Sequence, residues 1–343
     1  MGHPIAGQQA RAYEARMRER AARVFDALDE LVATLPVPPC HRELLRVHLK
    51  VGEEQAKAWP AMAAIQLPLL VHAAIAGAER PALSVAAACT LLYLGADLFD
   101  SVQDHELPPP WRERGPAEAT LAASTLMAAL PQLSVARLGQ QGTPSEKLWV
   151  LARLFADTLL SMSAGQHQDL IFPDAEDVSL EQSRAMVERK SGSDGALFAK
   201  AGAVLATEDA SRIEAYAAFG SCHGTARQLI TDVWDIWANE TSRDLLNGKR
   251  TLPVVHALCV LRGKQRERLR GLLAAARESE EHHDEVRAVL AAAGSVRYTA
   301  LIVRFHQRRA RNYLAAARPE GPAGRELHAL LDLATLPAYR EGA

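Results

Sequence analysis

The sequence predicts an all-α fold, and three observations support this prediction. Across the 343 residues, apolar side chains recur three and four positions apart, which is the spacing of one face of a helix. No stretch shows the strict apolar and polar alternation of a half-buried strand. Proline and glycine stand between the helical stretches, as at Pro36 and Gly77, where they end helices. We therefore expect packed helices and no sheet.

The expected helices follow one another with short breaks. Residues 61–76 are almost entirely apolar, which predicts a central helix, and Pro81 opens a second apolar helix that ends near Asp104. The segment 278–285 is rich in glutamate and histidine, and we interpret it as a solvated loop. The other expected helices cover residues 8–35, 41–58, 117–129, 145–165, 179–189, 196–206 and the stretch that contains residues 228–235.

Composition limits the class of protein. A chain of this length with 48% hydrophobic residues can bury a large core, and we favour one domain over residues 1–343, with an N-terminal helix at 1–36, a core at 37–260 and C-terminal helices at 261–343. A net charge of −2 gives no electrostatic indication of nucleic-acid binding. The four cysteines form no CxxC pair, which argues against a zinc knuckle or a disulfide framework.

The N-terminus predicts no targeting segment, because residues 1–20 are polar and charged and lack a secretory apolar core. The longest apolar stretches, residues 67–76 and 81–96, are expected to be too short or too interrupted to span a membrane. We therefore expect a soluble, cytoplasmic protein.

Two helical stretches carry carboxylates on one face. Gln228, Asp232 and Asp235 lie at positions i, i+4 and i+7 among apolar neighbours. Burying unpaired carboxylates in such surroundings is costly, so a cation is expected to meet them; salt bridges to a neighbouring helix are the alternative.

Asp97, Asp100 and Asp104 repeat this arrangement at i, i+3 and i+7. Ligands that are all oxygen favour magnesium over zinc, and magnesium in proteins is usually completed by phosphates and waters. A phosphate or diphosphate substrate is therefore implied.

Six motifs stand in a fixed order across residues 60–315. They are Asp100-Ser-Val-Gln-Asp104, Arg114-Gly-Pro116, Gly165-Gln166…Asp169-Leu170, Lys190-Ser-Gly192, Phe219-Gly220…Gly224…Gln228…Asp232…Asp235 and Asp244-Leu-Leu-Asn-Gly-Lys249-Arg-Thr-Leu-Pro253. This ordered set resembles the trans-polyprenyl synthetase family. The Asp-x-x-Asp-x-x-x-Asp form, with a tryptophan in the following loop, is similar to the branch that prenylates quorum-signal peptides.

The resemblance implies an antiparallel helical bundle around a deep central cavity, the isoprenoid synthase type I fold, in a homodimer. Three Mg²⁺ ions would join two aspartate-rich helices to an allylic prenyl diphosphate, with Asp97, Asp100, Asp104, Asp232 and Asp235 as the metal ligands. The family's pattern gives diphosphate contacts to Arg112, Arg114, Lys190 and Lys249. It gives Gln228 and Ser191 the place that faces the developing allylic cation.

The sequence departs from the family in two respects. Ser101 and Thr231 replace one aspartate in each metal motif, and Asp97 is the substitute we favour in the first. The family's basic segment for a homoallylic diphosphate reads Ala63-Ala-Ile-Gln66-Leu-Pro68 here, so isopentenyl diphosphate is disfavoured as acceptor. Prenyl transfer to an unknown acceptor is the leading hypothesis; a terpene cyclase and a non-catalytic subunit of a heteromeric synthase remain alternatives.

The length of the prenyl chain is a separate inference. In the family, the residues four and five positions before the first motif form the cavity floor, and here these are Ala96 and Gly95. Their small size predicts an allylic chain of fifteen carbons or more. The other side chains expected to line the cavity are Tyr93, Phe99, Phe198 and Trp234.

Overall fold

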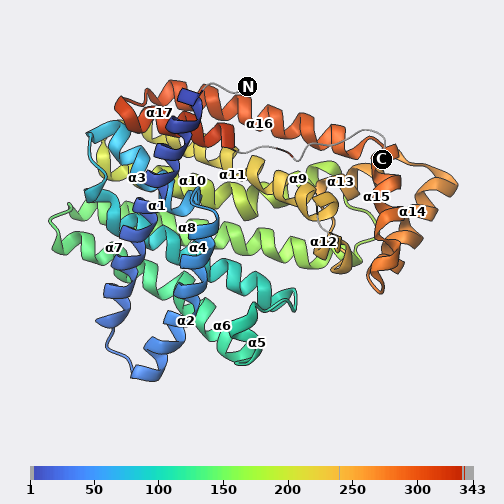
Figure 1. The fold of residues 1–343 in the computed structure, drawn as a ribbon, viewed down its shortest axis with the longest axis horizontal. Coiled ribbons are helices and arrows are strands. Elements are labelled where there is room, and N and C mark those ends of the chain that lie inside the picture. The colour runs from blue at the N-terminus through green and yellow to red at the C-terminus, as the bar shows by residue number, and fades with distance from the viewer. Residues whose placement is uncertain (1–3, 239, 334–335, 337–343) are drawn as a thin grey trace. The chain divides into compact units, whose positions relative to one another are not determined.

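The computed structural model describes residues 4–238, 240–333 and 336, and every element among them is a helix (Figure 1). The prediction of an all-α fold is confirmed. The sequence predicted most of the helices near their observed positions, because their apolar faces repeat with the helical period.

In chain order the elements are α1 (Pro4–Ala33), α2 (Pro39–Ala58), α3 (Ala63–Ala76), η1 (Arg80–Ala82), α4 (Leu83–Gln103), α5 (Pro109–Arg112), α6 (Pro116–Ser124), η2 (Thr125–Ala129), α7 (Leu130–Gln140), α8 (Ser145–Ile171), η3 (Phe172–Asp174), α9 (Leu180–Val187), η4 (Glu188–Gly192), α10 (Ser193–Ala206), α11 (Ala210–Ala238), α12 (Arg243–Leu246), α13 (Leu252–Val260), α14 (Gly263–Ala276), η5 (Glu280–His282), α15 (His283–Ala292), α16 (Ser295–Ala317) and α17 (Gly321–Leu333). The elements η2 and η4 are π-helices, whereas η1, η3 and η5 are 3₁₀-helices.

The chain divides into two compact units, which we describe separately. Unit 1 contains Met1–Leu159, Ala196–Gly220 and Tyr313–Leu330, and unit 2 contains Leu160–Gly195, Ser221–Asn312 and Leu331–Ala343. The single-domain organisation stays a prediction.

Unit 1 is built around α4, which packs against α3, α6, η2 and α7. The cluster at the end of α4 contains the buried side chains of Leu44, Leu98 and Trp111. The indole of Trp111 donates a hydrogen bond to Nδ1 of His48 at 3.2 Å, and Nε2 of His48 lies 2.8 Å from the carbonyl of Leu94. These bonds fix the aspartate-bearing end of α4 to α2 and α5.

Three helical stretches are long and apolar enough to cross a membrane by length and composition, namely Arg80–Gln103, Pro116–Gln140 and Ser145–Asp174. Two bent helix pairs pass the same test together. The prediction that the stretch from Pro81 is too short was wrong, because the helix continues through Leu98 and Phe99 to Gln103. Within unit 1 its apolar side chains are largely buried against neighbouring helices, which accounts for its hydropathy.

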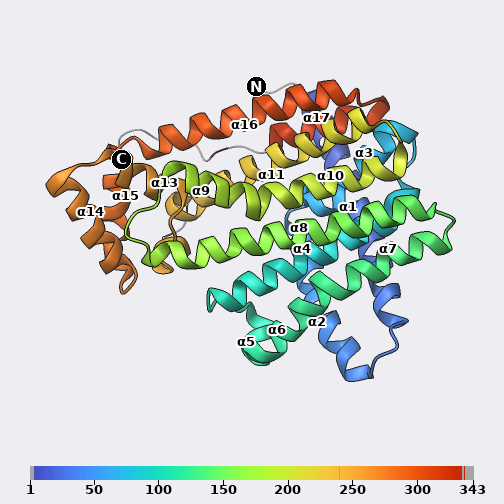
Figure 2. The same cartoon turned by 180° about the vertical axis from the view of Figure 1, so that it is seen from behind.

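Unit 2 has two hydrophobic clusters. In the first, α11, α9, α13 and α16 meet through side chains that include Ile230, Met186, Leu252 and Val303. Figures 1 and 2 show α11 and α16 running alongside each other in both views. The second cluster joins the end of α11 to α12, α13, α14 and α15. The far end of α11 is thus held from several sides.

Two local predictions differ from the structure. Helix α8 does not end near Gly165 but continues to Ile171, so Asp169 lies in its last turn. The segment 278–285 is not an open loop, because η5 and the first turn of α15 form there and His283 is buried. The acidic composition of this segment suits the first turn of a helix, where carboxylates meet the positive end of the helix dipole.

Candidate functional site

The site in unit 2 begins on one face of α11. Asp232 is buried, and its Oδ1 accepts a hydrogen bond from the side-chain amide of Gln228 at 2.8 Å. The hydroxyl of Ser191, in η4, donates to the Gln228 carbonyl oxygen at 2.9 Å. The amide of Gln228 is therefore held between Ser191 and Asp232, and its orientation is fixed by both partners.

Glycines bring η4 close to its neighbours. A Cβ atom at Gly224 of α11 would lie 2.0 Å from the carbonyl oxygen of Ser191, and one at Gly165 of α8 would lie 2.7 Å from the backbone nitrogen of Lys190. Only glycine permits such contacts without a shift of the backbone. These approaches place Lys190 and Ser191, on a π-helix of the kind that recurs at functional sites, beside the polar face of α11.

Two lysines converge on Asp169. The Nζ of Lys190 lies 2.8 Å from Oδ2 of Asp169, and the Nζ of Lys249 lies 3.7 Å from the same oxygen. All three side chains are largely buried, so water screens their charges weakly. The end of α8, η4 and the segment after α12 therefore share one charged cluster.

The segment between α11 and α13 is anchored by Asp235. Its Oδ1 accepts hydrogen bonds from the hydroxyl of Ser242 at 2.5 Å and from the backbone nitrogen of Asp244 at 3.0 Å. The backbone nitrogen of Ser242 donates to Nδ1 of the buried His283 at 3.2 Å. Gly248, at a φ of 67°, then turns the chain so that the Lys249 nitrogen donates to the Asp244 carbonyl at 2.8 Å.

Two carboxyl groups of this cluster, those of Asp232 and Asp244, have raised pKa values. Burial, with a smaller contribution from the charge of Asp169, raises the pKa of Asp232 to about 7, although the Gln228 bond and the two lysines oppose the rise. Burial also raises the pKa of Asp244 well above its ordinary value, and the charges of Asp232 and Asp235 add to the effect. The cluster therefore contains more buried carboxyl groups than its two lysines can keep ionised.

This surplus fits a bound cation. The donors are carboxylate oxygens, which suit a hard ion such as Mg²⁺ rather than zinc. Among the described residues, no group of three or more His, Cys, Asp or Glu side chains is arranged to hold a metal ion by itself. A cation here would need further oxygen ligands, and substrate phosphates and waters are the usual ones for Mg²⁺.

The first aspartate motif lies in unit 1, at the end of α4. Asp97, Asp100 and Asp104 are half-buried, and Oδ2 of Asp97 accepts a hydrogen bond from the Gln55 amide at 3.2 Å. His105, at a φ of 57°, ends the helix, and Glu106 bonds back to the Ser101 carbonyl at 2.8 Å. That this motif and the α11 motif share one substrate stays a prediction.

The two arginines predicted to contact diphosphate are exposed and bound within their own segment. Arg112 donates to the Leu107 carbonyl at 2.9 Å, and Arg114 pairs with Glu118 at 3.0 Å. Glu118 is exposed, so a ligand could replace it as the partner of Arg114.

The expected cavity floor differs from the sequence expectation at Gly95. A Cβ atom there would lie 2.6 Å from the backbone nitrogen of Met127 and 2.8 Å from the carbonyl of Ala123. Gly95 is therefore a close-packing position between α4 and η2, not an open floor.

The other residues expected to line a cavity have mixed surroundings. Phe99 packs on the cluster around Trp111, and Phe198 is fully buried within unit 1. Tyr93 and Ala96 are half-buried, whereas Trp234 is 46% exposed. Their burial therefore ranges from almost complete, at Phe198, to about half exposed, at Trp234.

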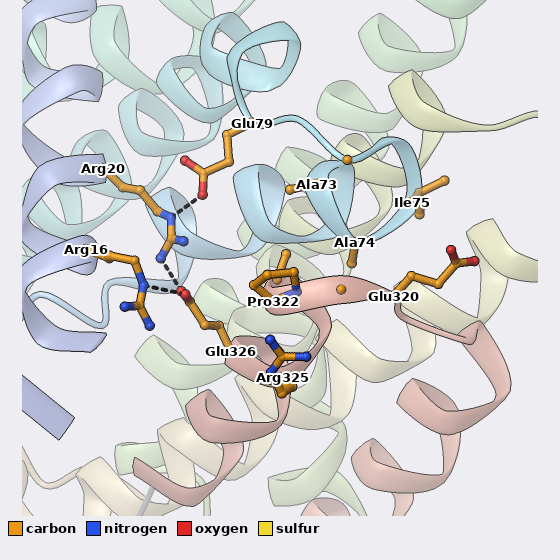
Figure 3. A pocket seen from close by; sticks show the side chains of 13 residues that line it. Arg16, Arg20, Ala73, Ala74, Ile75, Glu79, Glu320, Pro322, Arg325 and Glu326 are labelled. Carbon is orange, nitrogen blue, oxygen red and sulfur yellow. Dashed lines mark hydrogen bonds and ion pairs between the residues drawn. The ribbon is translucent and has the colours of Figure 1, made fainter. Parts of the chain in front are cut away.

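A cavity of about 710 Å³ in unit 1 is lined by none of the predicted site residues. Figure 3 shows Arg16 and Arg20 of α1 turned toward Glu79 and Glu326. Arg20 is buried and lies 2.7 Å from Glu79 and 2.6 Å from Glu326. This network ties α1 to η1 and α17, and its charges already compensate one another.

Sequence reasoning assigned no role to Asp169, Asp244 or His283, which complete the unit 2 cluster. Asp169 and Asp244 stand within the quoted motifs, so their position was available as a signal. His283 had none, because its bond to Ser242 spans 41 residues.

The chain is similar to known proteins of one family. Residues 109–291 match the family model described as Polyprenyl synthetase. The chain is 30% identical over 218 residues to a short chain isoprenyl diphosphate synthase of Methanothermobacter thermautotrophicus, a match that covers 60% of this chain and 66% of that protein. It is 25% identical over 265 residues to a geranylfarnesyl diphosphate synthase of Aeropyrum pernix, covering 74% of this chain and 82% of the relative. The match to the first relative therefore spans just under two thirds of its length.

Solved structures share the fold. A geranylgeranyl pyrophosphate synthetase from Pyrococcus horikoshii superposes with a TM-score of 0.81 at 24% identity, covering 95% of this chain and 98% of the other. A polyprenyl synthetase from Streptomyces coelicolor gives a TM-score of 0.78 at 25% identity, covering 95% of this chain and 99% of the other. The motif resemblance noted in the sequence is confirmed, and the chain belongs to the polyprenyl synthetase family.

Proposed function

We propose that this protein is a prenyltransferase that ionises an allylic prenyl diphosphate and passes the prenyl group to an acceptor, with release of diphosphate. The observation that carries the proposal is the buried cluster of unit 2, in which Lys190 and Lys249 meet Asp169 beside the strained carboxylates of Asp232 and Asp244. The relatives named as isoprenyl diphosphate synthases support the same reaction class.

The residues of unit 2 provide positive charges and one oriented amide dipole. The ammonium groups of Lys190 and Lys249 can neutralise the negative charge that grows on the leaving diphosphate as the carbon–oxygen bond breaks. Gln228 presents a fixed amide dipole, and the hydroxyl of Ser191 and the carboxylate of Asp232 hold that amide in place. The carbonyl side of the dipole can stabilise positive charge on the allylic carbon.

We propose Mg²⁺ as the cofactor, held in unit 2 by Asp232 and Asp244 and in unit 1 by Asp97, Asp100 and Asp104. Bound magnesium would supply Lewis-acid stabilisation of the leaving diphosphate. Asp235 is given a different role here, because its carboxylate is occupied by the Ser242 hydroxyl and two backbone nitrogens. It positions the segment that carries Asp244.

We propose an acceptor without a diphosphate group. In unit 1 the side-chain amide of Gln66 is buried and donates to the carbonyls of Met17 and Pro60, at 3.0 and 2.9 Å. It therefore holds α3 to α1 and is not available to a ligand. Lys57, the nearest lysine before it, is exposed and paired with Glu53 and Glu54. Arg20 donates to the Gln66 side-chain oxygen at 3.4 Å but is already paired with Glu79 and Glu326. A second diphosphate at the start of α3 would therefore lose hydration and would have to compete with these carboxylates for its basic partner.

The proposal extends to the assembly and the compartment. A homodimer would cover exposed apolar side chains of unit 1, such as Trp149, which is 77% exposed, and Leu121, which is 52% exposed. None of the four cysteines, all within the described residues, forms a disulfide, in keeping with a reducing cytoplasm. A chain of fifteen carbons or more remains part of the proposal, resting on Ala96, since Gly95 gives no open space.

The test is incubation of the purified chain with Mg²⁺ and geranyl, farnesyl or geranylgeranyl diphosphate, with and without isopentenyl diphosphate. We expect release of pyrophosphate with the two longer substrates, with water capturing the prenyl cation as the prenyl alcohol in place of the acceptor, and no dependence on isopentenyl diphosphate. Gas chromatography of the extract identifies the products. Elongated diphosphates would contradict the proposed acceptor class, and cyclic hydrocarbon formed without acceptor would replace transfer by cyclisation. If no pyrophosphate is released from any substrate, the catalytic proposal fails.

A further inference from the structure

The outer face of α16 carries an unusual set of side chains. The helix contains five arginines and no aspartate or glutamate. Two large apolar side chains lie among them, Leu301 at 63% and Phe305 at 53% exposed. We define the α16 stripe as the exposed residues of this face in unit 2, which are Arg297, Leu301, Arg304, Phe305, Arg308, Arg309 and Arg311.

The opposite face of α16 explains why the stripe points outward. Val303 is buried in the cluster with Leu229, Ile230 and Leu252, and Tyr298 and Ile302 pack against the same cluster. Residues three and four positions apart share a face, so Arg297, Leu301, Arg304, Phe305 and Arg308 lie together on the other side of the helix. The helix is thus fixed to unit 2 by one face and presents the stripe with the other.

The positive charge of the α16 stripe is concentrated on one helix and does not reflect the charge of the whole chain. The whole chain has a net charge of −2, so five arginines without an acid on one helix are a concentrated positive region. Asp332 pairs with Arg311 at 2.9 Å, and both side chains are exposed. Arg184 of α9 is also exposed, and together with Arg309 it adds to the burial that lowers the pKa of His306, beneath the stripe, to about 4. The positive field therefore extends beyond α16.

We propose that the α16 stripe docks unit 2 on a membrane surface that contains anionic lipids. The stripe runs for about 20 Å along one helix, at 1.5 Å per residue. Arginines on such a face attract anionic headgroups, while a leucine and a phenylalanine between them enter the boundary of the acyl chains. The guanidinium of Arg309 lies 5.5 Å from the centre of the Phe305 ring, so the apolar and charged groups form one surface.

Other occupants fit less well. A second copy of this chain would bring the stripe against itself in a two-fold contact, and its arginines would repel one another. An acidic protein segment would satisfy the charge, but recognition of a helix or strand uses a groove or a sheet edge, and the stripe is the outer side of a single helix. A flat anionic surface that also accepts Leu301 and Phe305 matches both features.

The test is flotation of the full chain with vesicles of neutral phosphatidylcholine, with or without about one third phosphatidylglycerol. We expect binding to the anionic vesicles in about 0.1 M salt and loss of most of it in about 0.5 M salt, because salt screens exposed charges. The double variant Arg304→Glu with Arg308→Glu should weaken partitioning more than about tenfold. Leu301→Ser with Phe305→Ser should weaken the part that survives high salt.

The matched control is Lys264→Glu with Arg268→Glu, which makes the same charge change at the same spacing on α14, where both residues are exposed. It should bind as the unchanged chain does. Circular dichroism and melting temperature establish that each variant is folded, and Arg304→Gln with Arg308→Gln offers a milder change. Equal binding by the α16 and α14 variants would overturn the proposal. Absence of binding of the unchanged chain to anionic vesicles at low salt would also overturn it, as would a finding that the α16 stripe binds an acidic protein and no vesicle.

Discussion

The two aspartate motifs have similar spacing in the sequence but different surroundings in the structure. Asp232 of α11 is 5% exposed, beside Asp169 and two buried lysines. The aspartates of α4 are half-buried at the end of their helix, where the chain turns at His105. Spacing determines which residues share a helix face, whereas burial and neighbouring charges determine what those residues can do.

The difference assigns different tasks to the two regions. In unit 2, Asp232 and Asp244 are costly to keep ionised without a cation, so ligand binding and proton binding compete there. In unit 1, the half-buried aspartates keep more contact with water. We expect substitutions in unit 2 to change both stability and activity, and those at the end of α4 to change activity alone.

The largest expected effect is on turnover. Asp232→Ala should lower the rate of pyrophosphate release about 1000-fold, because it removes a ligand position and releases Gln228. Asp100→Ala should lower it about 100-fold, since that site keeps Asp97 and Asp104 nearby on the same helix. Steady-state kinetics at saturating Mg²⁺ measure both. Near-normal turnover of the Asp232 variant would remove α11 from the site.

The second prediction concerns packing and compares glycines of the two units. Gly224→Ala should reduce the free energy of unfolding by about 3 kcal/mol, because its Cβ would meet the backbone of Ser191, and it should also impair turnover by displacing η4. Gly95→Ala should destabilise by a similar amount, through the backbone of Met127, with little direct effect on turnover per folded molecule.

Gly271→Ala is the matched control for both, since it lies within α14 and its Cβ would meet nothing within 4 Å. It should stabilise the chain by about 0.5–1 kcal/mol, as alanine does in a helix. Urea unfolding measures all three variants. If Gly224→Ala keeps both its stability and its turnover, the close approach of η4 and α11 does not position the site.

The sequence was sufficient for the fold class and for the α11 face. Helical periodicity predicted the elements, and the spacing of Gln228 and Asp232 predicted that they share a face, where the structure joins them by a hydrogen bond. Lys190 and Lys249 came from the motif resemblance, and both lie in the unit 2 cluster. Local spacing carries this kind of information because a helix converts it directly into a shared face.

Contacts between distant segments were beyond sequence reasoning. The sequence does not show whether Gly95 leaves open space or allows a neighbouring helix to come close. In the structure, the backbone at Met127 and Ala123 lies against it. The role of His283 depends on the fold of the chain between it and Ser242, which lies 41 positions earlier. Asp235 was predicted as a metal ligand from its spacing, yet its present partners are the Ser242 hydroxyl and two backbone nitrogens, which spacing does not reveal.

The third prediction uses pH. The folded-state pKa of Asp232 is raised to about 7, so the folded chain binds a proton that the unfolded chain has already lost above about pH 4. Stability of the metal-free chain should therefore fall as pH rises from about 4 to about 7. Asp232→Asn should remove part of this fall and gain about 2 kcal/mol over the unchanged chain near pH 8.

Chemical unfolding in the presence of a chelator, at pH 5 and at pH 8, provides the measurement. Asp26→Asn, an exposed change on α1, is the control and should leave the difference between the two pH values as it is. A fall in stability that persists unchanged in Asp232→Asn would assign the proton to another group.

The smallest expected effect separates the basic groups of the two regions. Lys190→Gln should raise the KM for the allylic diphosphate about tenfold, because the buried ammonium group is lost and Asp169 keeps only the more distant Lys249. Arg114→Gln should raise it no more than about threefold, since its guanidinium is exposed and already paired with Glu118. Lys57→Gln, at an exposed lysine of α2, should leave the KM unchanged. An Arg114 effect that equals or exceeds the Lys190 effect would show that diphosphate is held mainly from the unit 1 side, and would reverse the ranking of the two regions.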